Sequence, residues 1–310
     1  QLDRVELVDQ SILGKTPRSN PAVYIGAFDD IRELYAQSDL AKQRGLNASA
    51  FSFNSSQGQC ERCRGAGFEK IEMQFLSDVF IRCPDCDGRR YRSHILAIKL
   101  SPRESPKSKD QRPKSKAQRP YPSLEPRSIA DLLDSTVDEA IEFLHAFSGV
   151  RPAQRAAEGL RLLQEVGLGY LKLGQPINTL SGGESQRLKL VRHLAESSNQ
   201  PGSPPGRTLF LFDEPTTGLH FDDVRILLKV FQRLVDNGHS LVVIEHNLDV
   251  IKSADWIIDL GPDAGDEGGR IVVQGTPEAV AACAASHTGQ ALKQVLNPSS
   301  RSLRAVFQSR

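Results

Sequence analysis

Four of the five cysteines stand in two Cys-x-x-Cys pairs in the first third of the chain, C-x2-C-x19-C-x2-C: Cys60 and Cys63, then Cys83 and Cys86. This spacing is typical of structural zinc sites built from four thiolates. With all four positions filled, no place remains for a catalytic water, so the pattern predicts a structural Zn²⁺ ion. The alternatives are disulfide bonds, which a reducing cytosol disfavours, and a redox switch.

Glycines follow both pairs, among them Gly65 and Gly88, and permit the tight turns that aim backbone amides at sulfur. The run 68–81 between the pairs is apolar and β-prone, with Lys70 and Arg82 near its ends. A rigid hairpin flanked by cations could lie along a phosphate backbone. The alternative is a charged rim that faces only solvent.

Two adjacent acids, Asp213 and Glu214, follow the apolar run 208–212, so they stand at the carboxyl end of an expected buried strand. We expect Asp213 to hold Mg²⁺ through water and Glu214 to polarise an attacking water. His246 follows the next apolar run, 240–244, where its imidazole could bond a terminal phosphate. The alternatives are acids that merely end a strand and a structural histidine.

The stretch "TLSGGESQRLKLVRHL" contains an S-x-x-E capping box formed by Ser181 and Glu184, ahead of an apolar-periodic helix. Between them, Gly182 and Gly183 let backbone amides approach a phosphate, and the helix dipole favours an anion there. The alternative is an ordinary capped surface helix.

Composition excludes little. The 310 residues carry a formal net charge of +1 with 25% charged residues, so any nucleic-acid contact must come from local basic patches. No signal peptide is recognisable, and no apolar run approaches the ~18 residues of a membrane span. We expect a cytoplasmic protein. Cys283, in the helix-like "AVAACAAS", is expected to be a small buried residue.

The ordered series "LSGGESQR", "LFLFDEP", "TTGLH" and His246 resembles the ATP-binding cassette ATPases. The resemblance implies that 180–184 form the signature motif, Asp213 and Glu214 the Walker B pair, 217–220 the D-loop and His246 the switch histidine.

A Walker A loop is not recognisable. "LGKTPRSNP" contains Lys15 after Gly14, but Asp9 stands where the first glycine of the loop belongs, and Pro17 and Pro21 follow. A P-loop must run directly into a helix, which this stretch does not favour. We therefore expect the true loop to lie upstream of Gln1 and the chain to be a fragment, or else a natural truncation.

The cysteine segment lies between Gln10 and the signature motif, where transporter ATPases carry a helical subdomain. With "DQSILGKTPRSNPAVY", "RCPDCDGRRY" and "VVIEHNLDVIKSADWIIDLGP", this arrangement resembles the second ATPase half of the UvrA family of excinuclease proteins. The resemblance implies that Gln10 is the Q-loop glutamine. It also implies damaged double-stranded DNA, UvrB and a UvrA homodimer as partners, and ATP at composite sites shared between two halves.

The expected fold is α/β, an ATP-binding cassette half-domain without its Walker A segment and with an inserted zinc module. Strands are expected at 4–10, 208–212, 240–244, 256–260 and 270–275, and a helix between the second and third of them makes a βαβ unit. A further helix is expected to be capped by Thr136 with Glu139 and to carry an apolar stripe of Val137, Ala140, Ile141, Leu144 and Phe147. The expected organisation is an ATPase part with the Q-loop at 1–55, a zinc module at 56–95, a disordered basic insert at 101–127, the signature region and ATPase core at 128–296 and a disordered tail at 297–310.

The function expected from this resemblance is the carboxy-terminal portion of a DNA-damage-recognition ATPase of nucleotide excision repair that loads UvrB, with ATP, Mg²⁺ and Zn²⁺ as cofactors. ATP hydrolysis is expected of the full-length protein and not of this chain alone. The alternative is a truncated, non-catalytic zinc-containing paralogue that binds DNA or protein.

Overall fold

The structure is a computed structural model that describes residues 2–11, 13, 16, 18–71, 79–101, 125–198, 207–261 and 269–296, without the side chains of 195–198. Gly14, Lys15, most of the predicted basic insert and the predicted tail lie outside the described residues. The insert as predicted is too long at its end. Arg127 lies in β5 (Arg127–Ser128), which pairs with β4 (Lys99–Leu100).

Three parallel strands form a sheet in the order β1 (Arg4–Val8), β6 (Thr208–Asp213), β7 (Ser240–Ile244). Helix α9 (Phe221–Asp236) connects β6 to β7, which confirms the expected βαβ unit. Strand β1 ends at Val8 and not at Gln10 as predicted. The reason is that Asp9 and Gln10 bond to side chains and backbone beyond the sheet.

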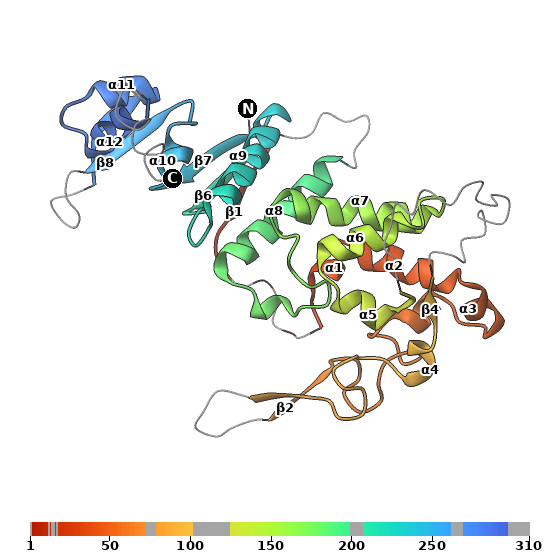
Figure 1. Ribbon diagram of the computed structural model, residues 1–310. Helices are drawn as coiled ribbons and strands as arrows, with labels where there is room; N and C mark the ends of the chain where they lie inside the picture. The colour runs from red at the N-terminus through yellow and green to blue at the C-terminus, as the bar shows by residue number, and fades with distance from the viewer. Residues whose placement is uncertain are drawn as a thin grey trace, which may run out of the picture.

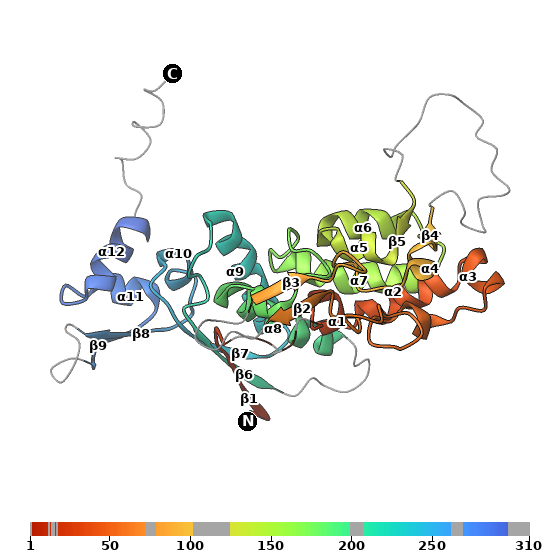
Figure 2. The ribbon, with the colours of Figure 1, turned by 90° about the horizontal axis from the view of Figure 1, so that it is seen from below.

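The two faces of this sheet differ. One face packs under α9 and α8 (Gly182–Ser198), with Phe210 and Phe212 almost fully buried, and Figure 2 shows these helices on one side of the strands. On the other face Leu7 and Val242 are 60% and 52% exposed. A parallel sheet normally has both faces covered by helices. Within the described part of the chain, this apolar face is left uncovered at Leu7 and Val242.

Beyond α10 (Leu248–Ile251), strands β8 (Ile257–Gly261) and β9 (Arg270–Gly275) form an antiparallel pair beneath α11 (Pro277–Ala282) and α12 (His287–Leu296). Cys283 was expected inside a helix and buried, and both expectations are wrong. It ends α11 in an extended conformation and is partly exposed, because the chain turns there toward α12.

The helical region lies on the other side of α8 and contains most of the core (Figure 1). Its helices are α1 (Pro21–Tyr24), α2 (Ala27–Ala36), α3 (Asp39–Gln43), η1 (Ala48–Phe51), α4 (Ser93–Leu96), α5 (Ile129–Asp134), α6 (Val137–His145) and α7 (Arg151–Glu165). The predicted capping box of α6 is present, since Thr136 and Glu139 each bond the other's backbone amide. The predicted apolar stripe of α6 is buried.

From this region a two-stranded arm extends away from α4 (Figure 1). It consists of β2 (Phe68–Ile71) and β3 (Val79–Arg82), which pair antiparallel and confirm the predicted hairpin on either side of residues 72–78, which lie outside the description. Within the described part of the chain, no helix has both the length and the apolar content needed to cross a membrane.

The covered face of the sheet should dominate its stability. Phe212 is 1% exposed and its ring lies 4.8 Å from that of Phe231, so Phe212→Ala should lower the free energy of unfolding by about 3–5 kcal/mol. Val242→Ala on the exposed face should cost about 0.5 kcal/mol or less. Urea denaturation measures both. Equal losses would mean that the two faces are buried alike.

Candidate metal centre and nucleotide site

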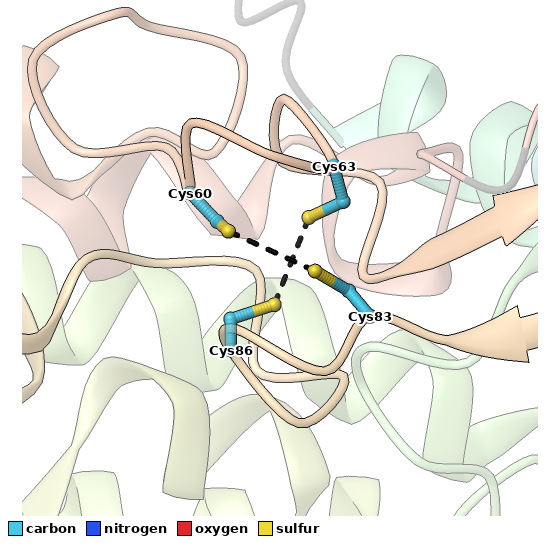
Figure 3. Close-up of side chains that lie close together, drawn as sticks. All are labelled: Cys60, Cys63, Cys83 and Cys86. Atoms are coloured by element: carbon cyan, nitrogen blue, oxygen red, sulfur yellow. Dashed lines mark hydrogen bonds between the residues drawn. The ribbon is translucent and has the colours of Figure 1, made fainter.

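The four cysteines of the two pairs converge on one point (Figure 3). All four sulfur atoms lie within 4.8 Å of one another and all four residues are buried. The Sγ atoms of Cys60 and Cys83 are 3.9 Å apart, and those of Cys63 and Cys86 are 3.6 Å apart. A tetrahedron with Zn–S bonds of about 2.3 Å has edges of ~3.8 Å, so the cluster fits a zinc ion. All five cysteines are free thiols, which excludes the disulfide alternative for this structure.

Two turns of similar geometry present these sulfurs. Each contains residues with positive φ, Arg64 and Gly65 in the first and Asp87 and Gly88 in the second. A side chain at Gly65 would place its Cβ 1.7 Å from a backbone oxygen, so only glycine fits there. The tightness of the first turn also brings the amide of Gly67 to 3.3 Å from the Cys63 sulfur.

The thiols of the cluster differ in how readily they ionise. Burial raises the pKa of Cys63 and of Cys86, so without a metal these thiols keep their protons at neutral pH. Burial acts in the same direction on Cys83, but the amides of Cys86 and Asp85 outweigh it and lower the pKa of Cys83. A metal must therefore displace protons to bind, and its affinity should fall on acidification.

The signature segment is anchored by a capping box, as predicted. The amide of Ser181 donates to Glu184 Oε2 at 2.7 Å, and the amide of Glu184 donates to Ser181 Oγ at 3.2 Å. The second oxygen of Glu184 accepts the Tyr170 hydroxyl at 2.7 Å. Burial together with this bond raises the pKa of Tyr170 to about 12. Both oxygens of Glu184 thus fix the start of α8.

Gln10 lies between the signature segment and the acidic pair. Its Nε2 donates to the backbone oxygen of Glu214 at 3.3 Å. A Cβ on Gly182 would come within 3.0 Å of Gln10 Oε1, and one on Gly183 within 3.3 Å of the Thr217 backbone oxygen. The two glycines therefore allow α8 to start directly against the predicted Q-loop and D-loop of the same chain.

Glu214 occupies a left-handed conformation, with φ of 42°, directly after β6. Its amide donates to the Ile244 oxygen at 2.9 Å, and its Oε2 accepts from Thr217 Oγ1 at 3.2 Å. His246 Nε2 lies 3.6 Å from Glu214 Oε1, and the two side chains are 85% and 48% exposed. The carboxylate and the imidazole for which the sequence predicts the roles of general base and phosphate ligand are thus side by side and exposed. Asp213 ends β6 with an exposed side chain.

Three residues to which the local sequence pattern assigned no role hold this edge together. Gln186 Nε2 donates to the backbone oxygens of Val8 and Asp213, at 2.7 and 3.2 Å, and so ties α8 to two strands. Lys189 bonds the carboxylate of Asp9 and, at 3.0 Å, its backbone oxygen. The signal in the sequence was spacing: Gln186 and Lys189 stand four and seven residues after Gly182, which places all three on one face of α8.

The third of these residues is Glu245. Its carboxylate accepts the amides of Thr216, His246 and Asn247 at 2.7, 2.9 and 3.0 Å. It thereby clamps the turn after β6 to the turn after β7. Nothing in the local sequence distinguishes this acid from one that faces solvent.

Proteins named UvrABC system protein A are similar to this chain along nearly all of its length. UvrABC system protein A of Methanothermobacter thermautotrophicus is 50% identical over 295 residues, which cover 95% of this chain and 27% of that protein. The Thermus thermophilus protein of the same name is 49% identical over 294 residues, with the same coverage, 95% and 27%. The crystal structure of UvrA2 from Deinococcus radiodurans superposes with a TM-score of 0.76 at 42% identity, covering 96% of this chain and 32% of that one.

The chain belongs to the UvrA family. It corresponds to a partial UvrA segment, since it spans 27% of the length of these curated relatives. No protein-family model matches it. The match confirms the α/β fold with its inserted four-cysteine module.

The metal centre predicts a stoichiometry. The zinc-loaded chain should contain about one Zn²⁺, and Cys83→Ser should lose most of it because one of four ligands is gone. Cys283→Ser, which lies outside the cluster, should keep it. Metal analysis after gel filtration measures both. A metal-free chain as stable as the zinc-loaded one would contradict a structural role.

The contact of α8 with β1 predicts a pH effect. The hydrogen bond from Lys189, followed by that from Ser11, lowers the pKa of Asp9 from 3.8 to about 2. The contribution of the ionised Asp9 carboxylate to the free energy of unfolding is therefore present above pH ~4 and lost as the pH falls toward 2. Lys189→Met should raise the pKa of Asp9 toward 3.8, as followed by carboxyl ¹³C NMR. Lys252→Met, which removes the partner of Asp249 instead, should not.

Proposed function

We propose that this chain supplies the carboxy-terminal ATPase portion of a UvrA-like protein that recognises damaged DNA. The observation that carries the nucleotide part is the convergence of Gln10, Gly182, Glu214 and His246 at the carboxyl edge of one sheet. Nucleotides bind at this edge in open α/β sheets.

The roles divide by chemistry. Asp213 would hold Mg²⁺, Glu214 would polarise the attacking water, and His246 would bond the terminal phosphate. Ser181, Gly182 and Gly183 present backbone amides to a phosphate, with Glu184 fixing their geometry. Mg²⁺, when bound, neutralises charge on the phosphates. The division of these residues between two composite nucleotide sites rests on the family resemblance alone.

The zinc hairpin is the proposed DNA contact. Lys70 and Arg82 are exposed on its two strands, and Phe80, 48% exposed, lies opposite Lys70. Cations position such an arm on phosphates, and an exposed aromatic ring can contact unstacked bases. Zinc keeps the arm rigid at its base. UvrB, a second UvrA copy and a cytoplasmic setting are proposed from the family.

The test is binding to a duplex that carries one bulky adduct, followed by fluorescence anisotropy, against the same duplex undamaged. The double variant Lys70→Glu with Arg82→Glu should bind roughly tenfold or more weakly, and its salt slope should fall by about 2. Arg225→Glu with Lys229→Glu, which makes the same charge change on α9, should bind like the unaltered chain.

Equal losses of DNA affinity in both double variants would mean that net charge, and not the hairpin, accounts for the binding. Binding that ignores the adduct would favour the non-catalytic binding module. In the same preparations ATP turnover should stay at background. Robust ATP hydrolysis that Lys15→Ala abolishes would show that Lys15, which the sequence analysis did not accept as a Walker A lysine, acts as one.

A further inference from the structure

Arg90 follows the second cysteine pair and lies in the wall between the metal centre and the helical region. It is 5% exposed and adopts a left-handed conformation with φ of 71°. Its backbone amide donates to the sulfur of Cys86, and its backbone oxygen accepts the amide of Cys60 at 2.8 Å. The backbone of this one residue is therefore bonded to a cysteine of each pair.

The side chain of Arg90 leaves the metal centre and reaches the chain that leads to the signature segment. Its guanidinium lies over the Phe53 ring, 5.1 Å from the ring centroid, and Nη2 donates to the backbone oxygen of Gly174 at 3.0 Å. The amide of Gly174 in turn donates to the Leu133 oxygen at 2.7 Å. Gly174 is thus held from both sides, once by the zinc module and once by α5.

A short path, with Ile177 buried at 2% exposure, joins Gly174 to α8. It consists of η4 (Ile177–Thr179) and Leu180, which is 6% exposed. The amide of Ile177 donates to the Ser19 oxygen at 2.9 Å, and the neighbouring Arg18 donates to the oxygen of Arg64, in the first cysteine turn, at 2.8 Å. The metal centre therefore contacts both the segment before the signature and the segment after Gln10.

The Arg90 contact has room to change. A cavity of about 310 Å³ lies beside it, lined by Arg89, Lys172 and Gly174 among others. This space could take up a guanidinium released from Gly174, and a coupling element needs such a second arrangement.

We propose that Arg90 is a positioning residue that couples metal occupancy of the four-cysteine site to the order of residues 174–184, which lead into and include the signature motif. With zinc bound, the two cysteine turns fix the backbone of Arg90, and its guanidinium holds Gly174. Without zinc, the bonds to Cys86 and Cys60 loosen, the guanidinium leaves Gly174, and η4 and the start of α8 lose protection. The inference rests on the metal site and needs neither ATP nor DNA.

Hydrogen exchange of the full chain, free of nucleotide and DNA, tests this coupling. The reporters are the amides of Ile177, Thr179 and Leu180. Chelation should speed their exchange roughly tenfold in the unaltered chain, the size expected for losing one charged hydrogen bond. Zinc-loaded Arg90→Lys should already exchange that fast, and chelation should add less than about twofold.

The matched control is Arg89→Ala, since the bonds described for the Arg89 guanidinium go to Asp131 and Ser128 at the start of α5 and not to Gly174. It should keep the full response to chelation. Arg90→Met serves as a second variant that keeps the apolar stem over Phe53. Both Arg90 variants should retain about one zinc per chain.

Three results would overturn the proposal. The first is a full chelation response in the Arg90 variants, the second is loss of zinc from them, and the third is equal loss of protection at Phe210 and Phe212, which would indicate global unfolding. Failure here would leave DNA binding untouched, so it can be told apart from failure of the proposed function.

Discussion

The docking of α8 onto the carboxyl edge of the sheet is the contact on which the rest of this structure depends. Gln186 is 1% exposed and its side-chain amide donates to the backbone oxygens of the last residues of β1 and β6, while Lys189 bonds Asp9 one helical turn further on. If the Gln186 side-chain amide were removed, the backbone oxygens of Val8 and Asp213 would lose their donor, at a cost of about 1–3 kcal/mol each. This contact brings Gln186 and Val8, 178 positions apart in the sequence, into one site.

With α8 fixed, the geometry of the acidic edge follows. Glu214 sits in an unfavourable backbone region, and such strain persists only where neighbours over-determine it. Here Ile244 accepts its amide and Glu245 clamps the two following turns. The chain thus gives up part of its stability to direct one carboxylate and one imidazole outward.

The four-cysteine module is held together in a different way. Its turns contain too few apolar residues for a core of their own, and its apolar cluster consists of the cysteines with Ala66 packed against them. A metal can replace such a core. Because Arg90 and Arg18 bond it to the segments on either side of the candidate nucleotide site, the module is continuous with the rest of the helical region.

Local patterns determined much of this protein: the four-cysteine spacing, the capping boxes at Ser181 and Thr136, the βαβ unit and the acidic pair were all readable, since each depends on near neighbours and periodicity. The end of β1, the extended Cys283 and the roles of Gln186 and Glu245 were not, because long-range bonds set them. Only the tertiary structure decided that Gln10 meets Gly182 and that Arg90 reaches Gly174. Local spacing determines on which face of a helix or strand a side chain lies. The packing of segments distant in the sequence determines which residues that face contacts.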